Sequence, residues 1–359
     1  MDEDSDPRRE FNDTGSCYGR CRNDAARTNS LQGEGSGDGY KQTTRELYRE
    51  AALTPDPGLC CTSTPVWRPP DLVVPERMLE MNYGCGTTVH PRDLVGQPTV
   101  LYVGVGGGME LLQFAYFSRK PGGVVGIDPV AEMREASRTN LAEAAARNPW
   151  LREEFVTLLD ADAPDLSLAD GSVDVAAQNC LFNIFEEDDL RQALAEVYRV
   201  LRPRGRFVLS DPVAPGPLPE HLRSDERLRA MCLSGAVTYE RYVAMLVEAG
   251  FGTIEVRARR PYRVLDPARY AIAEPILLHS VEVAAIKDPI PDDGPCVFTG
   301  RTCVFYGAEE SFDDGAGHVL RRDLPLPVCD KTARRLESLG RDDLLVTGPT
   351  WFYDGGGCC

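Results

Sequence analysis

Three cysteines carry the most specific chemical signal in the sequence. Cys85 stands between Gly84 and Gly86, which leave its backbone free to bend and its thiol uncrowded. Cys180 follows Gln178 and Asn179 at the end of an expected strand, and Cys232 lies in a later segment of small and apolar residues. Thiolates are soft ligands that prefer soft, thiophilic centres. These three thiols are therefore candidates for holding a thiophilic ion or metalloid.

The segments that must position these thiols alternate between strand and helix. This alternation predicts a doubly wound, mostly parallel α/β sheet with helices on both faces. Ligands of such sheets bind beyond the carboxyl ends of the strands, and Cys180 is expected at one of these ends. The expected strands are 99–104, 123–127, 155–159, 173–178, 205–210 and 252–258, and the expected helices are 109–118, 130–147, 187–201 and 238–249.

A glycine-rich turn follows the first expected strand, with Gly104, Gly106 and Gly108, and Asp128 ends the second strand. Glycines let the backbone approach a ligand closely, and an acid at the second strand end can accept hydrogen bonds from both ribose hydroxyls. The pattern predicts a nucleoside-binding site. By itself the turn is a weak signal, since nicotinamide, flavin and methyl-donor sites share it and some such turns hold no ligand.

Later motifs narrow the choice of cofactor. Asp162-Ala163 follows the third expected strand, Gly171-Ser172-Val173-Asp174 introduces the fourth, and Arg202-Pro203-Arg204-Gly205 precedes the fifth. This ordered series, over roughly residues 97–258, resembles the class I methyltransferases that use S-adenosylmethionine. The resemblance implies that the cofactor is held by Tyr102, Gly104, Gly106, Gly108, Asp128, Pro129, Asp162, Ala163 and Asn179.

One position departs from that family's pattern. The family often has an acid two positions before the first glycine of the turn, where it helps to hold the methionine end of the cofactor, and here the residue is Tyr102. Gly104, Gly106 and backbone groups, or another side chain, must then hold that end.

Cys85, Cys180 and Cys232 are all expected at the mouth of the cofactor site. Any one of them could be a small buried hydrophobe. Zinc is a second option, although it usually takes four ligands in closely spaced pairs and the chain has no Cys-x2-Cys motif. A trivalent centre that takes three thiolates and keeps a lone pair, such as arsenite, fits better. Its lone pair could accept the methyl group without a general base.

Two phrases, residues 81–94 and 178–185, are similar to the arsenosugar-biosynthesis branch of the arsenite methyltransferases. The similarity extends from about residue 43 to the C-terminus. It implies that Cys180 and Cys232 hold arsenic, that Cys85 is a third thiol, and that Cys60 or Cys61 relays disulfides. Thioredoxin or glutathione is the implied reductant, and arsenite or its thiol complex the substrate.

The terminal pair Cys358-Cys359 follows three glycines and could capture arsenic as a dithiol. Two other functions stay open: a methyltransferase acting on carbon, oxygen or nitrogen of a small organic molecule, with structural cysteines, and a metalloid-binding protein without activity.

Composition limits the other partners. The net charge is −17, from 39 Lys and Arg against 56 Asp and Glu, so nucleic acid and anionic membrane are not expected to bind. The sequence shows no apolar run of membrane-spanning length and no signal-peptide pattern at its start, which predicts a cytoplasmic protein. In a reducing compartment, 12 cysteines favour metalloid or redox chemistry over a disulfide framework.

The sequence predicts four parts. Residues 1–42 are expected to be a flexible tail, and 43–96 an N-terminal lid that carries Cys60, Cys61 and Cys85. The S-adenosylmethionine domain is predicted over 97–262, with a substrate insertion at about 212–237. A smaller α+β region is predicted over 263–359.

Overall fold

The computed structural model describes residues 39–56, 59 and 69–353. The predicted disulfide-relay residues Cys60 and Cys61 and the terminal pair Cys358-Cys359 lie outside these residues, as does most of the predicted tail.

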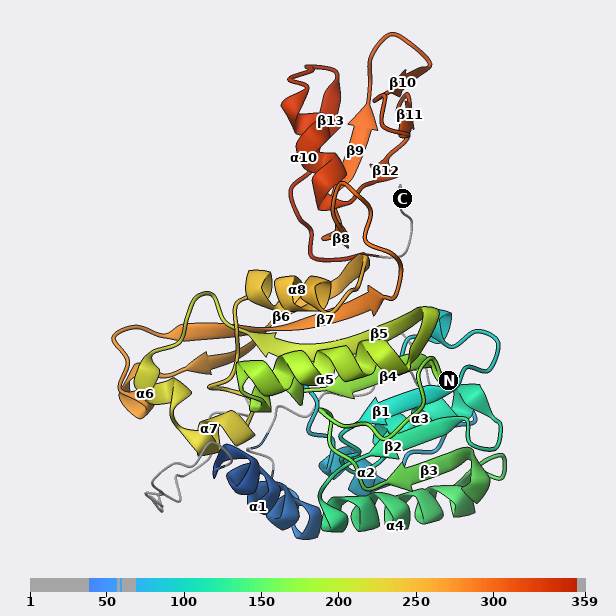
Figure 1. Ribbon diagram of the computed structural model, residues 1–359, viewed down its shortest axis with the longest axis vertical. Coiled ribbons are helices and arrows are strands. Elements are labelled where there is room, and N and C mark those ends of the chain that lie inside the picture. Colours follow the sequence, from blue (N-terminus) through green and yellow to red (C-terminus); the bar gives the residue numbers. More distant parts are fainter. Residues whose placement is uncertain (1–38, 57–58, 60–68, 354–359) are drawn as a thin grey trace, which may run out of the picture.

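An eight-stranded sheet forms the centre of the described part of the chain (Figure 1). Its strands are β1 (Val100–Val103), β2 (Val124–Ile127), β3 (Val156–Leu159), β4 (Val173–Asn179), β5 (Leu201–Val213), β6 (Thr253–Leu265), β7 (Ile276–Ile286) and β8 (Cys296–Phe298). The strand order is β3-β2-β1-β4-β5-β7-β6-β8. The first five of these strands pair in parallel, whereas β7 runs antiparallel between β5 and β6. The architecture is that of the predicted α/β fold.

The central position of β1 follows from its composition. Every residue of this strand is buried, and β2 and β4 pair with it on its two sides. A short, continuous apolar run is what a parallel strand covered on both faces requires. The turn after β1 therefore emerges near the middle of the sheet edge.

Ten α-helices surround or extend this sheet within the described residues: α1 (Gly39–Leu53), α2 (Glu76–Glu80), α3 (Met109–Ser118), α4 (Ala131–Arg147), α5 (Glu187–Val200), α6 (Glu220–Arg223), α7 (Glu226–Ala230), α8 (Tyr239–Glu248), α9 (Pro267–Tyr270) and α10 (Asp330–Ser338). Short 3-10 helices occupy Pro91–Asp93, Glu153–Phe155 and Phe182–Ile184.

Helix α5 is amphipathic, as the spacing of its apolar residues predicts. Its buried face consists of Leu190, Ala193, Leu194 and Val197. Acidic residues in its first turn suit the positive end of the helix dipole.

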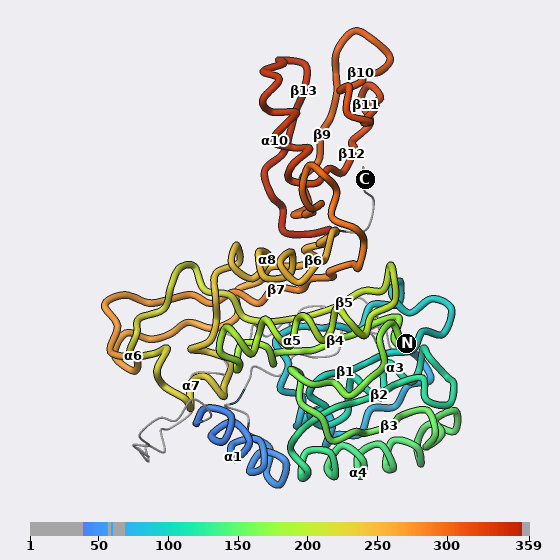
Figure 2. The backbone as a smooth tube through the Cα atoms, in the orientation of Figure 1, coloured from blue at the N-terminus to red at the C-terminus, as the bar shows by residue number. Residues whose placement is uncertain are grey.

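The N-terminal segment closes over the carboxyl ends of the strands. Helix α1 packs against α7, which lies in the connection between β5 and β6, and against α4 (Figure 2). Tyr40 donates a hydrogen bond to Asp189, and Thr43 donates one to Glu226 at 2.6 Å. These contacts hold α1 beside the edge where a ligand of this fold would bind.

The C-terminal residues form a smaller unit that stands out from the main body (Figures 1 and 2). It contains β9 (Thr302–Phe305), β10 (Ser311–Asp313), β11 (Val319–Arg321), β12 (Leu326–Pro327), β13 (Leu344–Val346) and α10. Strands β12, β9 and β13 form a small antiparallel sheet. Its own core includes Cys303, Phe305, Leu320 and Leu336.

The large sheet extends further along the chain than the sequence predicts. The boundary predicted at residue 262 falls inside β6, and β7 and β8 come from the region that the sequence assigns to the C-terminal unit. Strand β5 begins at Leu201, whereas the sequence predicts a helix up to that residue and a turn before residue 205. The predicted insertion over 212–237 contains α6 and α7.

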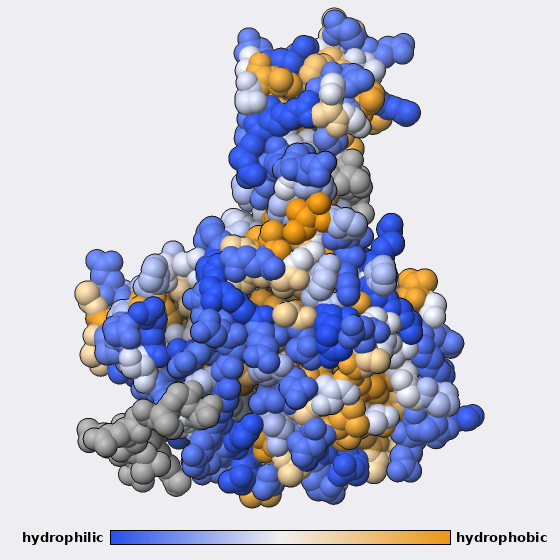
Figure 3. Space-filling model, in the orientation of Figure 1, coloured by the Kyte–Doolittle hydropathy of each residue, from blue (hydrophilic) through white to orange (hydrophobic). Residues whose placement is uncertain are grey.

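The visible face is mostly hydrophilic, as the excess of acidic residues leads one to expect (Figure 3). None of the described helices combines the length and the apolar character needed to span a membrane.

Candidate active site

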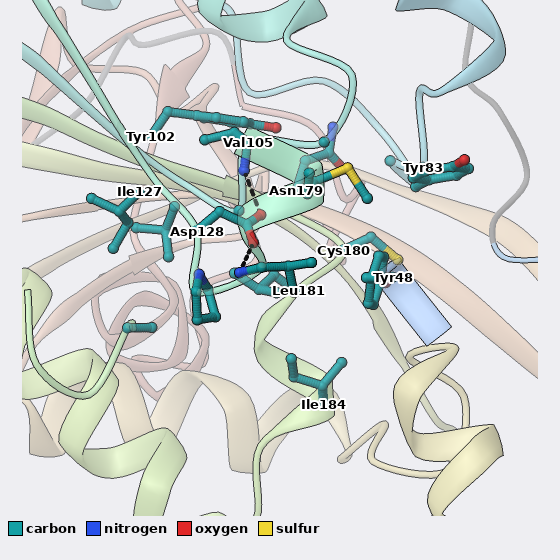
Figure 4. A pocket seen from close by; sticks show the side chains of 18 of the residues that line it. Tyr48, Tyr83, Tyr102, Val105, Ile127, Asp128, Asn179, Cys180, Leu181 and Ile184 are labelled. Carbon is teal, nitrogen blue, oxygen red and sulfur yellow. Dashed lines mark hydrogen bonds between the residues drawn. The ribbon is translucent and has the colours of Figure 1, made fainter. Parts of the chain in front are cut away.

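A pocket lies at the carboxyl ends of β1, β2 and β4 (Figure 4). The glycine turn, Asp128, Asp162 and the end of β4 form one part of its wall. Residues of α1 and the segment 81–84 form another part. All the predicted cofactor residues line it except Gly108.

The glycine turn has the backbone conformation that its composition predicts. Gly104 and Gly106 have φ values of 81° and 50°, in the left-handed region that side chains disfavour. Gly108 is also left-handed, with φ of 86°, but it caps α3 and does not line the pocket. A Cβ atom there would lie 2.7 Å from Ser137 Oγ of α4. Gly108 therefore lets α3 approach α4, and its role as a cofactor contact stays a prediction.

Asp128 sits at the tip of β2 with its carboxyl group held by the backbone. Its oxygens accept hydrogen bonds from the Val105 N–H at 3.1 Å and from the Val130 N–H at 2.9 Å (Figure 4). Burial raises the pKa of this carboxyl to about 7, although the two backbone hydrogen bonds oppose the shift. Each oxygen keeps a lone pair that can accept from a ligand hydroxyl.

Glu110 is the functional candidate that sequence reasoning missed. Tyr102 donates a hydrogen bond to this buried carboxyl group, which also accepts from the N–H and Oγ1 of Thr88, each at 3.0 Å. Both Tyr102 and Glu110 line the pocket. Burial raises the pKa of both groups. Helix α3 thus brings an acid close to the position where the family often has one.

Asp162, which follows β3 and lines the pocket, lies against helix α1. Asp162 Oδ1 accepts a hydrogen bond from the Ala163 N–H at 2.8 Å, and its Oδ2 lies 3.4 Å from Arg45 of α1. Pro129 and Arg45 also line the pocket. The N-terminal segment therefore supplies a wall beside the predicted adenine-binding residues.

Asn179, the last residue of β4, ties the segment around Cys85 to the pocket. Its Oδ1 accepts from the Cys85 N–H at 3.0 Å, and its Nδ2 donates to the Gly86 carbonyl at 2.9 Å. The same Nδ2 lies 3.3 Å from Glu110 Oε2. A Cβ atom on Gly84 would lie 2.4 Å from this amide, so glycine permits the close approach.

The three predicted thiols gather around the ends of β4 and β5. Cys232 Sγ donates to the Cys180 carbonyl oxygen at 2.7 Å. Cys85 Sγ lies 3.3 Å from Ser210 Oγ, and the Ser210 carbonyl accepts from the Cys180 N–H at 2.7 Å. Cys180 and Cys232 are buried, Cys85 is half-buried, and all three are thiols. Cys180 also lines the pocket.

Backbone strain marks two of these cysteines. Cys180 and Cys232 have φ values of 59° and 57°, in the left-handed region that is uncommon for residues with a side chain. Such conformations cost free energy and cluster at functional sites.

The environment of the thiols is largely apolar. The Tyr262 hydroxyl lies 4.0 Å from Cys180 Sγ, and Cys85 packs against a cluster that includes Leu233, Ala236 and Tyr262. In the described part of the chain, no three His, Cys, Asp or Glu side chains are placed so that they could hold a metal ion. A three-thiol site is therefore not preassembled.

Together, the strand order, the glycine turn and the acid at the tip of β2 define a class I methyltransferase. Residues 101–209 match a family model described as a methyltransferase domain. The chain is 30% identical over 287 residues to an arsenite methyltransferase of Aquipseudomonas alcaligenes, which covers 77% of this chain and 81% of that relative. It is 33% identical over 177 residues to an arsenite methyltransferase of Halobacterium salinarum, of which the match covers 43%.

A solved structure shows the same fold. It is that of an arsenic(III) S-adenosylmethionine methyltransferase from Chlamydomonas reinhardtii, with a TM-score of 0.56 and 23% identity, and the match covers 80% of this chain and 99% of that one. This chain belongs to the arsenite methyltransferase family, and its cofactor is S-adenosylmethionine.

Proposed function

We propose that this protein methylates trivalent arsenic held by Cys180 and Cys232, with Cys85 as a third thiol. The observation that carries the proposal is the contact between Cys232 Sγ and the carbonyl of Cys180, a residue that lines the cofactor pocket. Two strained cysteines beside a methyl-donor site suit a soft, thiophilic substrate.

Arsenite, delivered as a thiol complex, would exchange its ligands for these thiols. Because the thiols do not form a ready three-ligand site, arsenic binding is expected to draw their side chains together. The apolar surroundings would keep water from the arsenic. A trivalent arsenic with three sulfur ligands keeps a lone pair, and aligning that pair with its target can supply roughly 7–11 kcal/mol in favourable cases.

The residues of the pocket would hold the cofactor in three places. Asp128 would accept from the ribose hydroxyls, Asp162 and Ala163 would meet the adenine, and the glycine turn with Glu110 and Tyr102 would hold the methionine end. S-adenosylmethionine supplies an electrophilic methyl group. No residue needs to remove a proton, since the nucleophile is a lone pair.

Methylation formally raises arsenic to the pentavalent state, and two electrons return it to the trivalent state. Two cysteine thiols can supply these electrons by forming a disulfide and releasing two protons. We assign this relay to the three active-site cysteines with Cys60 or Cys61, and the final reduction to thioredoxin or glutathione in the cytoplasm. The same activity would serve arsenic detoxification or arsenosugar biosynthesis.

Arsenic speciation tests the proposal. Purified protein with labelled S-adenosylmethionine, arsenite and a thiol should give methylated arsenic. Cys180→Ser and Cys232→Ser should lower the rate at least 100-fold, while Cys303→Ser, a buried cysteine of the C-terminal unit, should not. Thiol-independent transfer to an organic acceptor would indicate an ordinary small-molecule methyltransferase. Tight arsenite binding without product would indicate a non-catalytic metalloid-binding protein.

A further inference from the structure

A second pair of cysteines lies in a buried cluster outside the active site. Cys296 and Phe298 stand two positions apart on β8 and therefore point to the same face. Cys329, the N-cap residue of α10, and Tyr353 complete the cluster, and the rings of Phe298 and Tyr353 stack at 4.7 Å. The cluster thus combines two thiols with two aromatic walls.

The first turn of α10 is fixed to both ends of β8. Lys331 Nζ donates to the Gly294 carbonyl at 2.8 Å and pairs with Asp293 at 2.6 Å, just before the strand. Thr299, just after the strand, donates to Asp330 at 2.6 Å. These contacts hold Cys329 against the strand that carries Cys296.

A chain of polar groups leads away from the Cys329 thiol. Its Sγ lies 3.2 Å from Thr332 Oγ1, which lies 3.4 Å from His318 Nε2. His318 Nδ1 lies 2.7 Å from Asp314 Oδ2, which favours the tautomer with the proton on Nδ1. Nε2 is then an acceptor, so the thiol proton can pass through the Thr332 hydroxyl to the imidazole.

Charged groups of both signs surround the two thiols. Cys329 is the N-cap residue of α10, and the Lys331 ammonium group of the first turn interacts with both thiols, while the carboxyl groups of Asp293 and Asp330 lie near Cys329. Burial lowers the pKa of Lys331, but its hydrogen bond to Asp293 and the neighbouring acidic groups raise it overall.

We propose that Cys296 and Cys329 form a second arsenic site, which binds singly methylated trivalent arsenic. The assignment rests on the proposed function, since that activity makes such a compound. Two thiols match the two exchangeable positions of methylarsonous acid, and the apolar walls suit its methyl group. Its chemical role would be to retain the intermediate between methylation steps.

The binding step is balanced without an oxidant or reductant. Two As–S bonds form, two As–O bonds break, and arsenic stays trivalent. The proton of each thiol leaves with a hydroxyl group as water. At Cys329, His318 accepts the proton through Thr332 and returns it to the departing hydroxide.

Cys303 supplies a matched control within the same unit. It is also fully buried, but it belongs to a different apolar cluster. The described residues of that cluster include no second cysteine, so Cys303 has no partner thiol there for an arsenic that takes two thiols.

The first test is a binding measurement on the full-length chain in which every cysteine except Cys296, Cys303 and Cys329 is replaced by serine. Methylarsonous acid is added without S-adenosylmethionine, and bound arsenic is counted by mass spectrometry after gel filtration. We expect one arsenic per chain, retained in Cys303→Ser and reduced at least tenfold in Cys296→Ser or Cys329→Ser. The proposal would be overturned if all three variants lost bound arsenic equally. It would also be overturned if the three-cysteine parent protein bound no arsenic.

A second test uses the unmodified chain and does not depend on how the variants fold. After treatment with methylarsonous acid, trypsin should release peptides 288–301 and 323–331 joined through one CH3As group. Peptide 302–321, which carries Cys303, should be absent from the bridged product, and its presence there would contradict the assignment. Neither test measures methyl transfer, so a failure of the proposed function would leave their outcome unchanged.

Discussion

The Sγ atom of Cys232 lies 2.7 Å from the carbonyl oxygen of Cys180, and both residues have left-handed backbones. The carbonyl lies directly after β4, and the thiol lies in the connection that follows β5. This contact joins the methyl-donor pocket to the segment that covers it. A left-handed backbone does not favour cysteine over other residues. The presence of cysteine at both positions is therefore consistent with the chemical role that we propose for the two thiols.

Ser210 should tune arsenite binding without affecting the cofactor. Its hydroxyl lies 3.3 Å from Cys85 Sγ, while its carbonyl holds the Cys180 N–H. Ser210→Ala removes only the hydroxyl, so we expect KM for arsenite to rise about three- to tenfold, which corresponds to roughly 1 kcal/mol for one hydrogen bond. The Kd for S-adenosylmethionine should stay unchanged in calorimetry. Ser118→Ala, which loses a buried hydroxyl bonded to the Pro98 carbonyl, is the control.

Placing at position 102 the acid that the family often has there should lower the stability of this protein and weaken its binding of the cofactor. Tyr102→Glu would place a second carboxyl group against the buried Glu110. Like charges so close cannot both ionise in a buried site, so we expect lower thermal stability and at least tenfold weaker cofactor binding. Adding Glu110→Gln should recover much of both losses, because an amide can donate to the new carboxylate. Additive losses in the double variant would mean that the two side chains do not act as one unit.

Asp128 should make cofactor binding depend on pH near neutrality. Its pKa is raised to about 7 mainly by burial, and the ionised form is the better acceptor for two hydroxyls. We expect the Kd for S-adenosylmethionine to increase as the pH falls from 8 to 6. Calorimetry in buffers of different ionisation enthalpy should also detect protons released on binding near pH 6.5. Asp128→Asn should bind weakly at every pH, and a pH-independent Kd in the unmodified protein would refute this role.

The same carboxyl group should affect stability in the opposite direction. Its pKa is higher in the folded chain than the ordinary value of 3.8, so its contribution to stability is complete below pH 4 and is lost as the pH rises through 7. Asp211 has a pKa raised to about 7 by burial as well, and it contributes a slope of the same sign. Urea unfolding of the cofactor-free protein from pH 5 to 8 should therefore show a slope that Asp128→Asn reduces only in part.

A comparison of Gly108 with Gly122 separates the effect of close packing between α3 and α4 from the effect of backbone strain. In Gly108→Ala, the added Cβ would be strained at φ of 86° and would meet Ser137 Oγ at 2.7 Å. Gly122 is left-handed too, with φ of 63°, but its Cβ would meet nothing within 4 Å. We expect Gly122→Ala to lose about 1–2 kcal/mol of unfolding free energy and Gly108→Ala to lose clearly more. If the two variants lost the same unfolding free energy, the Ser137 side chain would move aside without destabilising the protein.

Sequence patterns predicted much of the fold because the signals are local. The first four strands and the helices of the central region lie within a few residues of their predicted limits, since apolar runs, glycine turns and caps occur within each segment. The left-handed glycine turn at the pocket and the position of Cys180 directly after the fourth strand also agree with what the sequence predicts.

The features that sequence analysis missed depend on distant contacts. Strand β7 reaches its place between β5 and β6 only after a reversal of the chain, and no local pattern indicates which strands it joins. Glu110 could be suspected only from the absence of an acid at Tyr102, because its burial depends on Thr88 and Asn179. Gly108 resembles its neighbours in the turn, and only the approach of Ser137 reveals its role in packing α3 against α4.

The place of β7 in the sheet has a consequence for biosynthesis. Strands β5 and β6 flank the connection that carries Cys232, yet each hydrogen-bonds to β7 and they do not pair with each other. During translation, their edges stay open until the ribosome has released the chain well beyond Ile286, and such edges favour aggregation. The thiols that we propose to bind arsenic would then be assembled late, so arsenite present during synthesis could capture them before the sheet is complete.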